Sequence, residues 1–148
     1  FLTGVVLLGD VIHKSVINEY IVVGGLLGTL MFLNVWLVIW PNQQIALGMK
    51  PGNAGVAGGK ALLASRTNTM FSAPMAYCML ASPHLGYDAA NLLSAEGGGM
   101  GLYVVLALVA ALEGNAIAGK LGPITTVKGV IHASIGLTVI IVLILNFL

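Results

Sequence analysis

The chain has 148 residues, of which 58% are hydrophobic and only 7% are charged, and its formal net charge is +1. Soluble domains carry about 25% charged residues, so six Lys or Arg and five Asp or Glu cannot keep a water-exposed surface of this size hydrated. The composition therefore excludes a soluble globular domain, and the absence of any basic run in the sequence predicts no nucleic-acid partner.

Four stretches of the chain are long and apolar enough to cross the hydrocarbon core of a bilayer, which takes about 20 residues. They cover residues 21–40, 58–80, 98–118 and 124–146, and the second is the least apolar. Residues 1–9 are apolar but too short to span, so we expect the end of a fifth helix or an interfacial helix there. The sequence thus predicts an all-α integral membrane protein, with residues 1–148 forming one bundle of four transmembrane helices plus a short N-terminal apolar segment.

The charges of the connections predict how these spans are oriented. Connections rich in Lys and Arg stay on the cytoplasmic side of a membrane. Basic residues follow the first and third spans, whereas the connection over residues 81–97 carries Asp88 and Glu96 and no Lys or Arg. The basic connections are therefore predicted to face the cytoplasm, at a bacterial inner membrane. Their cations are Lys50, Lys60, Arg66, Lys120 and Lys128.

The polar residues inside the spans fall at one depth, in the inner third of the predicted bundle. They are Asn34, Ser65, Arg66, Thr67, Asn68, Thr69, Glu113, Asn115, Lys128 and His132. An ionisable group at membrane depth costs about 2.5–3.5 kcal/mol, so Glu113 is expected to pair with a cation, with Arg66 the first choice and Lys128 the second. This layer is either a pocket for a quinone head group, a proton path or a small anionic substrate, or a structural layer. In the structural case Arg66 and Lys128 extend to the interface while Glu113 fixes the helix register.

His132 is either a hydrogen-bonded structural residue or a haem ligand. Haem with two axial histidines would need a second His at the same depth, which the chain does not provide, so it would be shared with a partner subunit or a missing helix. His13 and His84 belong to the outer side, where they could approach each other and hold a metal. The single cysteine, Cys78, excludes an internal disulfide, a CxxC redox pair and the CxxCH attachment of haem.

Two local patterns predict how the helices pack. Gly24-x-x-x-Gly28 lies well inside the first span and matches the small-residue contact pattern of membrane helices, which predicts a close helix contact there. Pro74 lies inside the second span and is expected to kink it, because proline lacks an N–H and crowds the carbonyl one turn earlier.

The region from Asn34 to Ser82 combines a Trp-Pro-x-Gln helix exit, an Arg–Asn-containing helix and a Ser-x-Pro kink. The positions that carry this pattern are Asn34, Trp36, Trp40, Pro41, Gln44, Arg66, Asn68 and Pro74. The pattern resembles the membrane module at the N-terminus of membrane-bound bacterial urate oxidases. The family's module is commonly followed by a cytochrome c domain, which implies electron delivery towards a respiratory chain. This chain departs from the family in having no CxxCH and room for only four or five helices.

The resulting hypothesis is a membrane subunit of a redox or electron-transfer complex, not an enzyme on its own. It would contact the bilayer, other membrane subunits and a partner such as a cytochrome c, and would share a haem or a quinone with that partner. The candidate cofactor-contacting residues are His132, Arg66, Asn68, Asn34, Glu113, Trp36, Trp40 and Gln44. Two alternatives are a structural accessory subunit of a larger membrane complex and a small transporter or proton channel.

Overall fold

The computed structural model describes residues 2–13, 17–85 and 99–148, and helix is the only regular structure in these ranges. The predicted all-α class is therefore confirmed. In chain order the elements are α1 (Leu2–His13), α2 (Glu19–Leu33), the π-helix η1 (Asn34–Ile39), α3 (Trp40–Ala46), α4 (Ala54–Leu85), α5 (Met100–Ala118), the 3₁₀-helix η2 (Gly122–Thr125) and α6 (Val127–Phe147).

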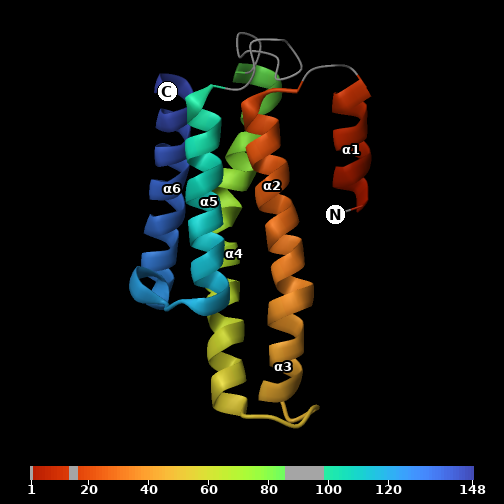
Figure 1. Ribbon diagram of the computed structural model, residues 1–148, viewed down its shortest axis with the longest axis vertical. Coiled ribbons are helices and arrows are strands. Elements are labelled where there is room, and N and C mark those ends of the chain that lie inside the picture. The colour runs from red at the N-terminus through yellow and green to blue at the C-terminus, as the bar shows by residue number, and fades with distance from the viewer. Residues whose placement is uncertain (1, 14–16, 86–98) are drawn as a thin grey trace.

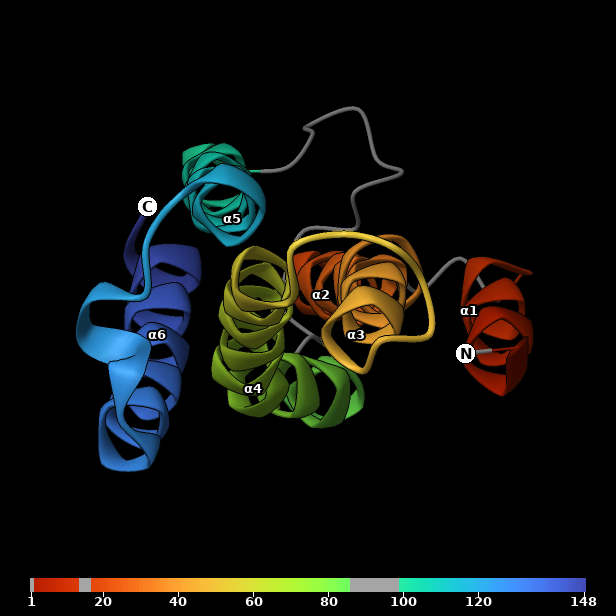
Figure 2. The ribbon, with the colours of Figure 1, turned by 90° about the horizontal axis from the view of Figure 1, so that it is seen from below.

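The helix α4 lies at the centre of the bundle. Helices α2, η1 and α3 form one continuous rod on one side of it, while α5 and α6 form an antiparallel pair on the other (Figure 1). Seen along the bundle, α4 stands between α2–α3 and α6, with α5 on a third side, and α1 lies apart from the rest (Figure 2). Every other long helix thus packs on α4.

Three helical segments are long and apolar enough to cross a membrane: Glu19–Ala46, Met100–Ala118 and Val127–Phe147. The predicted span over residues 58–80 falls inside α4, which is long enough at 32 residues but is not among the segments of sufficient apolarity. Its central position fits this composition, because some of its polar side chains are covered by the bundle. Thr67 is 1% exposed, and Asn68 donates to the carbonyl of Met31 on α2.

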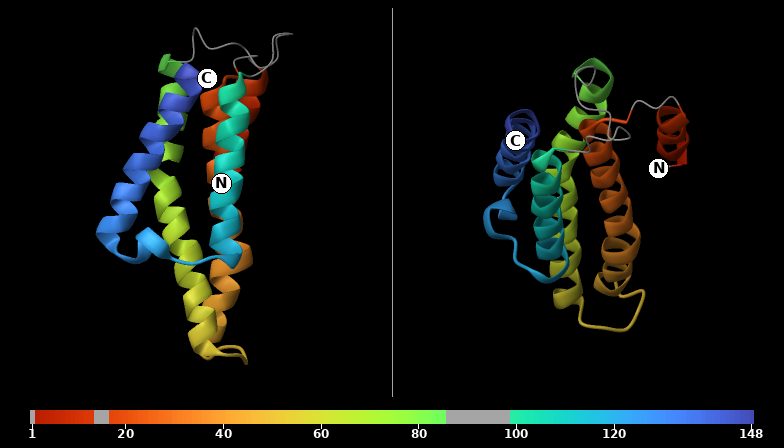
Figure 3. Two further views of the ribbon diagram at one scale, coloured as in Figure 1. Left: turned by 60° about the vertical axis from the view of Figure 1, so that its left-hand side comes forward. Right: turned by 45° about the horizontal axis from the view of Figure 1, so that its top comes forward.

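The two halves of the bundle differ in length. At 1.5 Å per residue, the 28 residues of Glu19–Ala46 and the 32 of α4 extend about 42 and 48 Å, against about 28 and 32 Å for the 19 of α5 and the 21 of α6. The turn between α3 and α4 therefore projects beyond the connection between α5 and α6 (Figures 1 and 3). We call this side the basic end, because it carries Lys50, Lys60, Lys120 and Lys128. Asp88 and Glu96, expected in the opposite connection, lie outside the described residues.

Glycine sets the closest approach between α2 and α4, as the Gly24-x-x-x-Gly28 pattern predicted. A Cβ on Gly24 would lie 3.2 Å from the backbone nitrogen of Met79 and 3.3 Å from the Cβ of Cys78. Residues of α2, α4, α5 and α6 complete the apolar core around this contact. Its most deeply buried large side chains include Val23, Leu27, Phe71, Val105 and Ile141.

A helix irregularity lies next to Pro41. α4 stays helical through Pro74, and the kink expected there stays a prediction. One turn before Pro41, by contrast, the α2–α3 rod widens into η1, where the N–H of Trp40 donates to the carbonyl of Val35. Because the proline ring crowds the carbonyl four residues earlier, a wider π turn accommodates it, and such turns often occur at functional sites.

Candidate functional site

Three polar side chains from three helices meet near the basic end of the bundle. The Nδ2 amide of Asn34 donates to Oδ1 of Asn68 and to Oε2 of Glu113, both at 3.0 Å. The Nδ2 amide of Asn68 in turn donates to the carbonyl of Met31 at 2.9 Å. We call Asn34, Asn68 and Glu113 the polar node. It joins the α2–α3 rod, α4 and α5 by side-chain hydrogen bonds, and Asn34 at its centre is only 2% exposed.

The helix periodicity explains why Arg66 does not belong to the node. Two residues along an α-helix correspond to a rotation of about 200°, so when Asn68 faces Asn34, Arg66 points to another side of α4. Within residues 2–13, 17–85 and 99–148 the structure gives Glu113 no cationic partner, and the expected pair with Arg66 or Lys128 is not formed. An uncharged amide, that of Asn34, occupies the place predicted for a cation.

The second carboxylate oxygen of Glu113 is open to the surface. Among the described residues no fully buried side-chain nitrogen or oxygen lacks a hydrogen-bond partner. Since Oε2 accepts from Asn34 and Oε1 makes no such bond, Oε1 lies where solvent or a ligand can reach it. The node therefore holds Glu113 by one oxygen and presents the other.

A groove of about 420 Å³ between α2 and α5 leads to this carboxylate. Glu113 is the only ionisable residue in its lining, and the rest is aliphatic side chains and one glycine. The lining residues are Leu26, Leu30, Leu106, Val109, Ala110, Glu113, Gly114 and Ile117. The groove is thus mostly apolar with one polar group, which suits an amphipathic molecule better than a hydrated ion.

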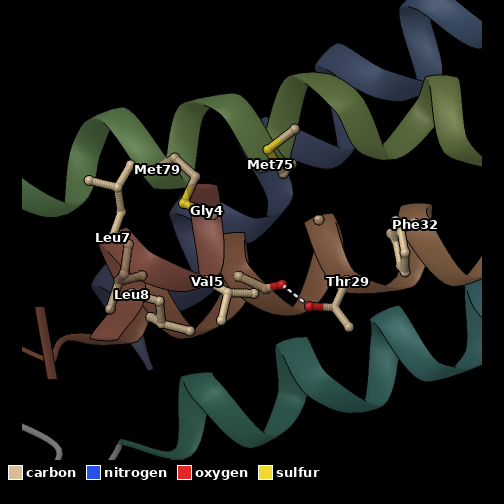
Figure 4. A pocket seen from close by; sticks show the side chains of 11 residues that line it. Gly4, Val5, Leu7, Leu8, Thr29, Phe32, Met75 and Met79 are labelled. Carbon is tan, nitrogen blue, oxygen red and sulfur yellow. Dashed lines mark hydrogen bonds between the residues drawn. The ribbon is translucent and has the colours of Figure 1, made fainter. Parts of the chain in front are cut away.

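The larger hollow of the bundle carries no chemistry of this kind. It measures about 630 Å³ and lies between α1 and the facing sides of α2 and α4, with Val5, Leu7, Phe32, Met75 and Met79 in its lining (Figure 4). Its one side-chain hydroxyl, on Thr29, already donates to the carbonyl of Gly25 within α2. This hollow is an apolar gap beside α1, and the polar node is the better candidate site.

The remaining predicted site residues lie away from the node. Trp36 and Trp40 are 57% and 44% exposed on the outside of the α2–α3 rod, and the ring of Trp36 lies 6.3 Å from that of Phe32. Gln44 is half-buried, and its backbone carbonyl closes the turn after α3 by accepting from Met49 at 2.8 Å. The tryptophans thus suit contact with lipid or a partner, whereas Gln44 helps to end the rod.

His132 stands on the exposed side of α6. Its Nδ1 lies 2.7 Å from the carbonyl oxygen of Lys128, one turn earlier. Because a carbonyl only accepts, Nδ1 is the donor in this contact, and in the neutral ring Nε2 is then the nitrogen that can accept a hydrogen bond or ligate a metal. In the ranges that the structure describes, no group of three or more His, Cys, Asp or Glu side chains could hold a metal ion.

A second buried polar cluster, which the sequence did not suggest, lies at the opposite end. Asn18 donates from Nδ2 to the carbonyl of Ser82 at 2.9 Å, and its Oδ1 accepts from the Ser82 hydroxyl at 3.1 Å. The same Oδ1 caps α2 by accepting from the N–H of Ile21 at 3.0 Å. We call Asn18 and Ser82 the terminal latch. An asparagine just before an apolar run is an N-cap signal, which could have indicated Asn18.

Comparisons of the chain with protein-family models, curated proteins and solved structures found no match. The resemblance to the membrane module of bacterial urate oxidases therefore stays a prediction, and the case for function rests on the site itself.

Proposed function

We propose that this chain is an integral membrane subunit of a redox assembly in a bacterial cytoplasmic membrane, with α4 as its fourth span. Support comes from the position of α4 between helices that are apolar enough to span, and from its length of 32 residues. The lysines gathered at the basic end support a cytoplasmic location of that end, because of the positive-inside rule. Partner subunits of the assembly, such as a cytochrome c, supply or remove electrons.

The direct role of the chain is to bind the head group of a lipid-soluble electron carrier of the quinone class. The observation that carries this is the groove between α2 and α5, whose lining is apolar except for Glu113, a carboxylate with one oxygen free of hydrogen bonds. A quinone has an apolar tail, which fits an aliphatic groove reached from the bilayer. In the quinol form the hydroxyls of its head group can donate to a carboxylate, and oxidation of the quinol releases protons that the carboxylate can accept while partner subunits take the electrons.

The polar node serves this role by fixing the carboxylate. Both hydrogens of the Asn34 amide are used, one on Asn68 and one on Glu113, so the side chain cannot turn without breaking a bond. Asn68 is itself held by the carbonyl of Met31. Glu113 is thereby positioned by a chain of neutral donors and keeps one oxygen for the ligand.

The test is substitution of Glu113→Gln in the purified native assembly. Glutamine can still accept from Asn34 through its carbonyl oxygen, so the thermal unfolding midpoint should stay close to that of the unmodified assembly. Quinol-dependent electron transfer, measured with a water-soluble short-chain quinol, should fall at least tenfold, a change of about 1.4 kcal/mol. Glu19→Gln is the matched control, because Glu19 accepts from the Gly99 N–H at 2.7 Å far from the groove. Full activity of Glu113→Gln would rule out the quinone role.

A haem shared with a partner subunit is supported by a separate observation. Histidines that ligate metals usually donate their other ring N–H to a carbonyl or carboxylate, and His132 has this arrangement with Lys128. Its exposed Nε2 would supply one axial ligand, and the partner the other. A redox difference spectrum of the assembly should show haem bands that shift in His132→Met; an unchanged spectrum would remove His132 from the haem site.

The second candidate function is a structural accessory subunit. The observation that favours it is that the polar node links three helices, which is what a purely architectural element also needs. In that case Glu113→Gln changes the yield of assembled complex and nothing else. Activity per assembled complex therefore separates the two functions.

A further inference from the structure

The side of α4 that no other helix covers has an unusual composition. We call it the open face: Leu62, Ser65, Thr69, Ala76 and Leu80 are exposed on it, and Arg66 and Ser72 are half-exposed. These positions recur every three or four residues, so they form one stripe along the helix. In Figure 2 the other three sides of α4 are flanked by α2–α3, α5 and α6, and no helix stands on the fourth.

The open face differs from the outward sides of α5 and α6. Those helices expose apolar side chains such as Tyr103, Val104, Ile135 and Val139, as expected for contact with lipid. On the open face the hydroxyls of Thr69 and Ser72 are satisfied within α4, by the carbonyls of Ser65 and Thr69 at 3.1 and 2.7 Å. The small residues therefore permit the close approach of another helix, and the hydroxyls of Thr69 and Ser72 need no further hydrogen-bond partner.

Arg66 is the one charged residue of the open face, and its guanidinium needs hydrogen-bond acceptors or an acid at this depth. Within the described ranges its guanidinium makes no hydrogen bond or ion pair, although it lies only about 3 Å along the helix from the level of Asn68. Arginines inside membrane spans face the bundle interior or a water-filled cavity and pair with an acid or with carbonyls. The one described acid at this depth, Glu113, is on another side of α4 and bonded to Asn34.

We propose that the open face of α4 docks a transmembrane helix of a partner subunit, and that this helix carries a carboxylate at the level of Arg66. Two features define the fit: small residues such as Ser65 and Ala76 for close contact, and a guanidinium without a partner in the described ranges, which can pair with an acidic side chain. A second copy of this chain is the poorer occupant, because Glu113, its one described acid at this depth, is partly buried in the groove between α2 and α5. The proposal rests on the membrane placement given above and not on the quinone site.

Site-specific photocrosslinking in native membranes tests the proposal. A benzophenone side chain at Ala76, on the open face, should form an adduct of one defined mass upon illumination. Ala107 is the matched control, because it is exposed on α5 at a similar distance from the opposite end. The same group there should label lipid only. Sequencing of the Ala76 adduct should identify an apolar segment with an Asp or Glu within one helical turn of the level of Arg66.

The charge is tested in the same experiment. Arg66→Gln should lower the yield of the adduct at least tenfold, and Arg66→Lys should restore most of it. Arg66→Glu combined with Lys at the partner's acidic position should restore it as well. If Arg66→Gln does not accumulate, Ala76→Trp with Arg66 intact should block docking by bulk, whereas Ala107→Trp should not.

Three results would overturn the proposal: an adduct of lipid alone at Ala76, an adduct of two copies of this chain, or a partner helix without an acid. A quinone-binding result has no bearing on these outcomes. Loss of quinol activity with the Ala76 adduct intact, or the reverse, therefore shows which of the two proposals has failed.

Discussion

The polar node and the terminal latch both bury an asparagine between α4 and the α2–α3 rod, yet they differ in what they leave unused. At the latch, Asn18 and Ser82 satisfy each other and the cap of α2, and no charged side chain takes part. At the node, Asn34 spends both of its donors on neighbours, and one of these is a carboxylate with a free oxygen. Burial of an asparagine thus indicates helix pairing in both places, and the added acid marks the site that can do chemistry.

The change Asn34→Asp should break this comparison with the largest effect. It removes both N–H donors of the Asn34 amide and places a second carboxylate about one hydrogen-bond length from Glu113, where like charges repel each other. We expect a loss of about 3 kcal/mol in stability, measured as a lower thermal unfolding midpoint of the purified assembly. Asn42→Asp is the control, since Asn42 only donates to the carbonyl of Val38 on its own helix.

Removal of the Asn18 side chain from the terminal latch should destabilise the assembly less than Asn34→Asp does. Asn18→Ala removes the cap of α2 and both bonds to Ser82, and should cost about 2 kcal/mol. Because the latch lies far from Glu113, quinol-dependent activity per assembled complex should not change. A drop in that activity would mean that the two clusters are coupled, and that their separation into structural and chemical sites is wrong.

The smallest effect is expected for Asn18→Asp. Aspartate caps a helix as well as asparagine does, and its charge is favourable beside a helix N-terminus. It can still accept from the Ser82 hydroxyl, and only the bond to the Ser82 carbonyl is lost. The cost should stay below about 1 kcal/mol in the same unfolding assay. The same substitution would thus separate the two asparagines by about 2 kcal/mol.

Much of this architecture could be predicted from composition and depth. The all-α class, the Gly24 contact and the common level of Asn34, Asn68 and Glu113 each follow from apolar length or from residue counting along helices. Depth says nothing about direction around a helix axis, however. For this reason Arg66 was expected beside Glu113, although the rotation between Arg66 and Asn68 turns it away.

Other features could not be predicted because they depend on which helices become neighbours. Ser82 lies in a segment read as a connection, and only the extension of α4 to Leu85 brings it to Asn18. The polar character of α4 could be recognised from the sequence, but its central position in the bundle could not. His132 was assigned to the polar layer by depth, whereas Trp36 and Trp40 were candidates through the family resemblance. The packing leaves all three on the surface.

The π-helix between α2 and α3 has a consequence for how this rod tolerates change. A π turn holds one residue more than an α turn, so everything after Ile39 is displaced by about 100° relative to an unbroken helix. Deleting one residue, Leu37, would return the segment to ordinary winding while leaving Asn34 in place on α2. The α3 segment, which begins at Trp40, would then be rotated about the rod axis, so that Trp40 faces another side of the bundle. The extra residue is in effect an insertion within the helix, and it sets the direction in which Trp40 faces independently of the buried node.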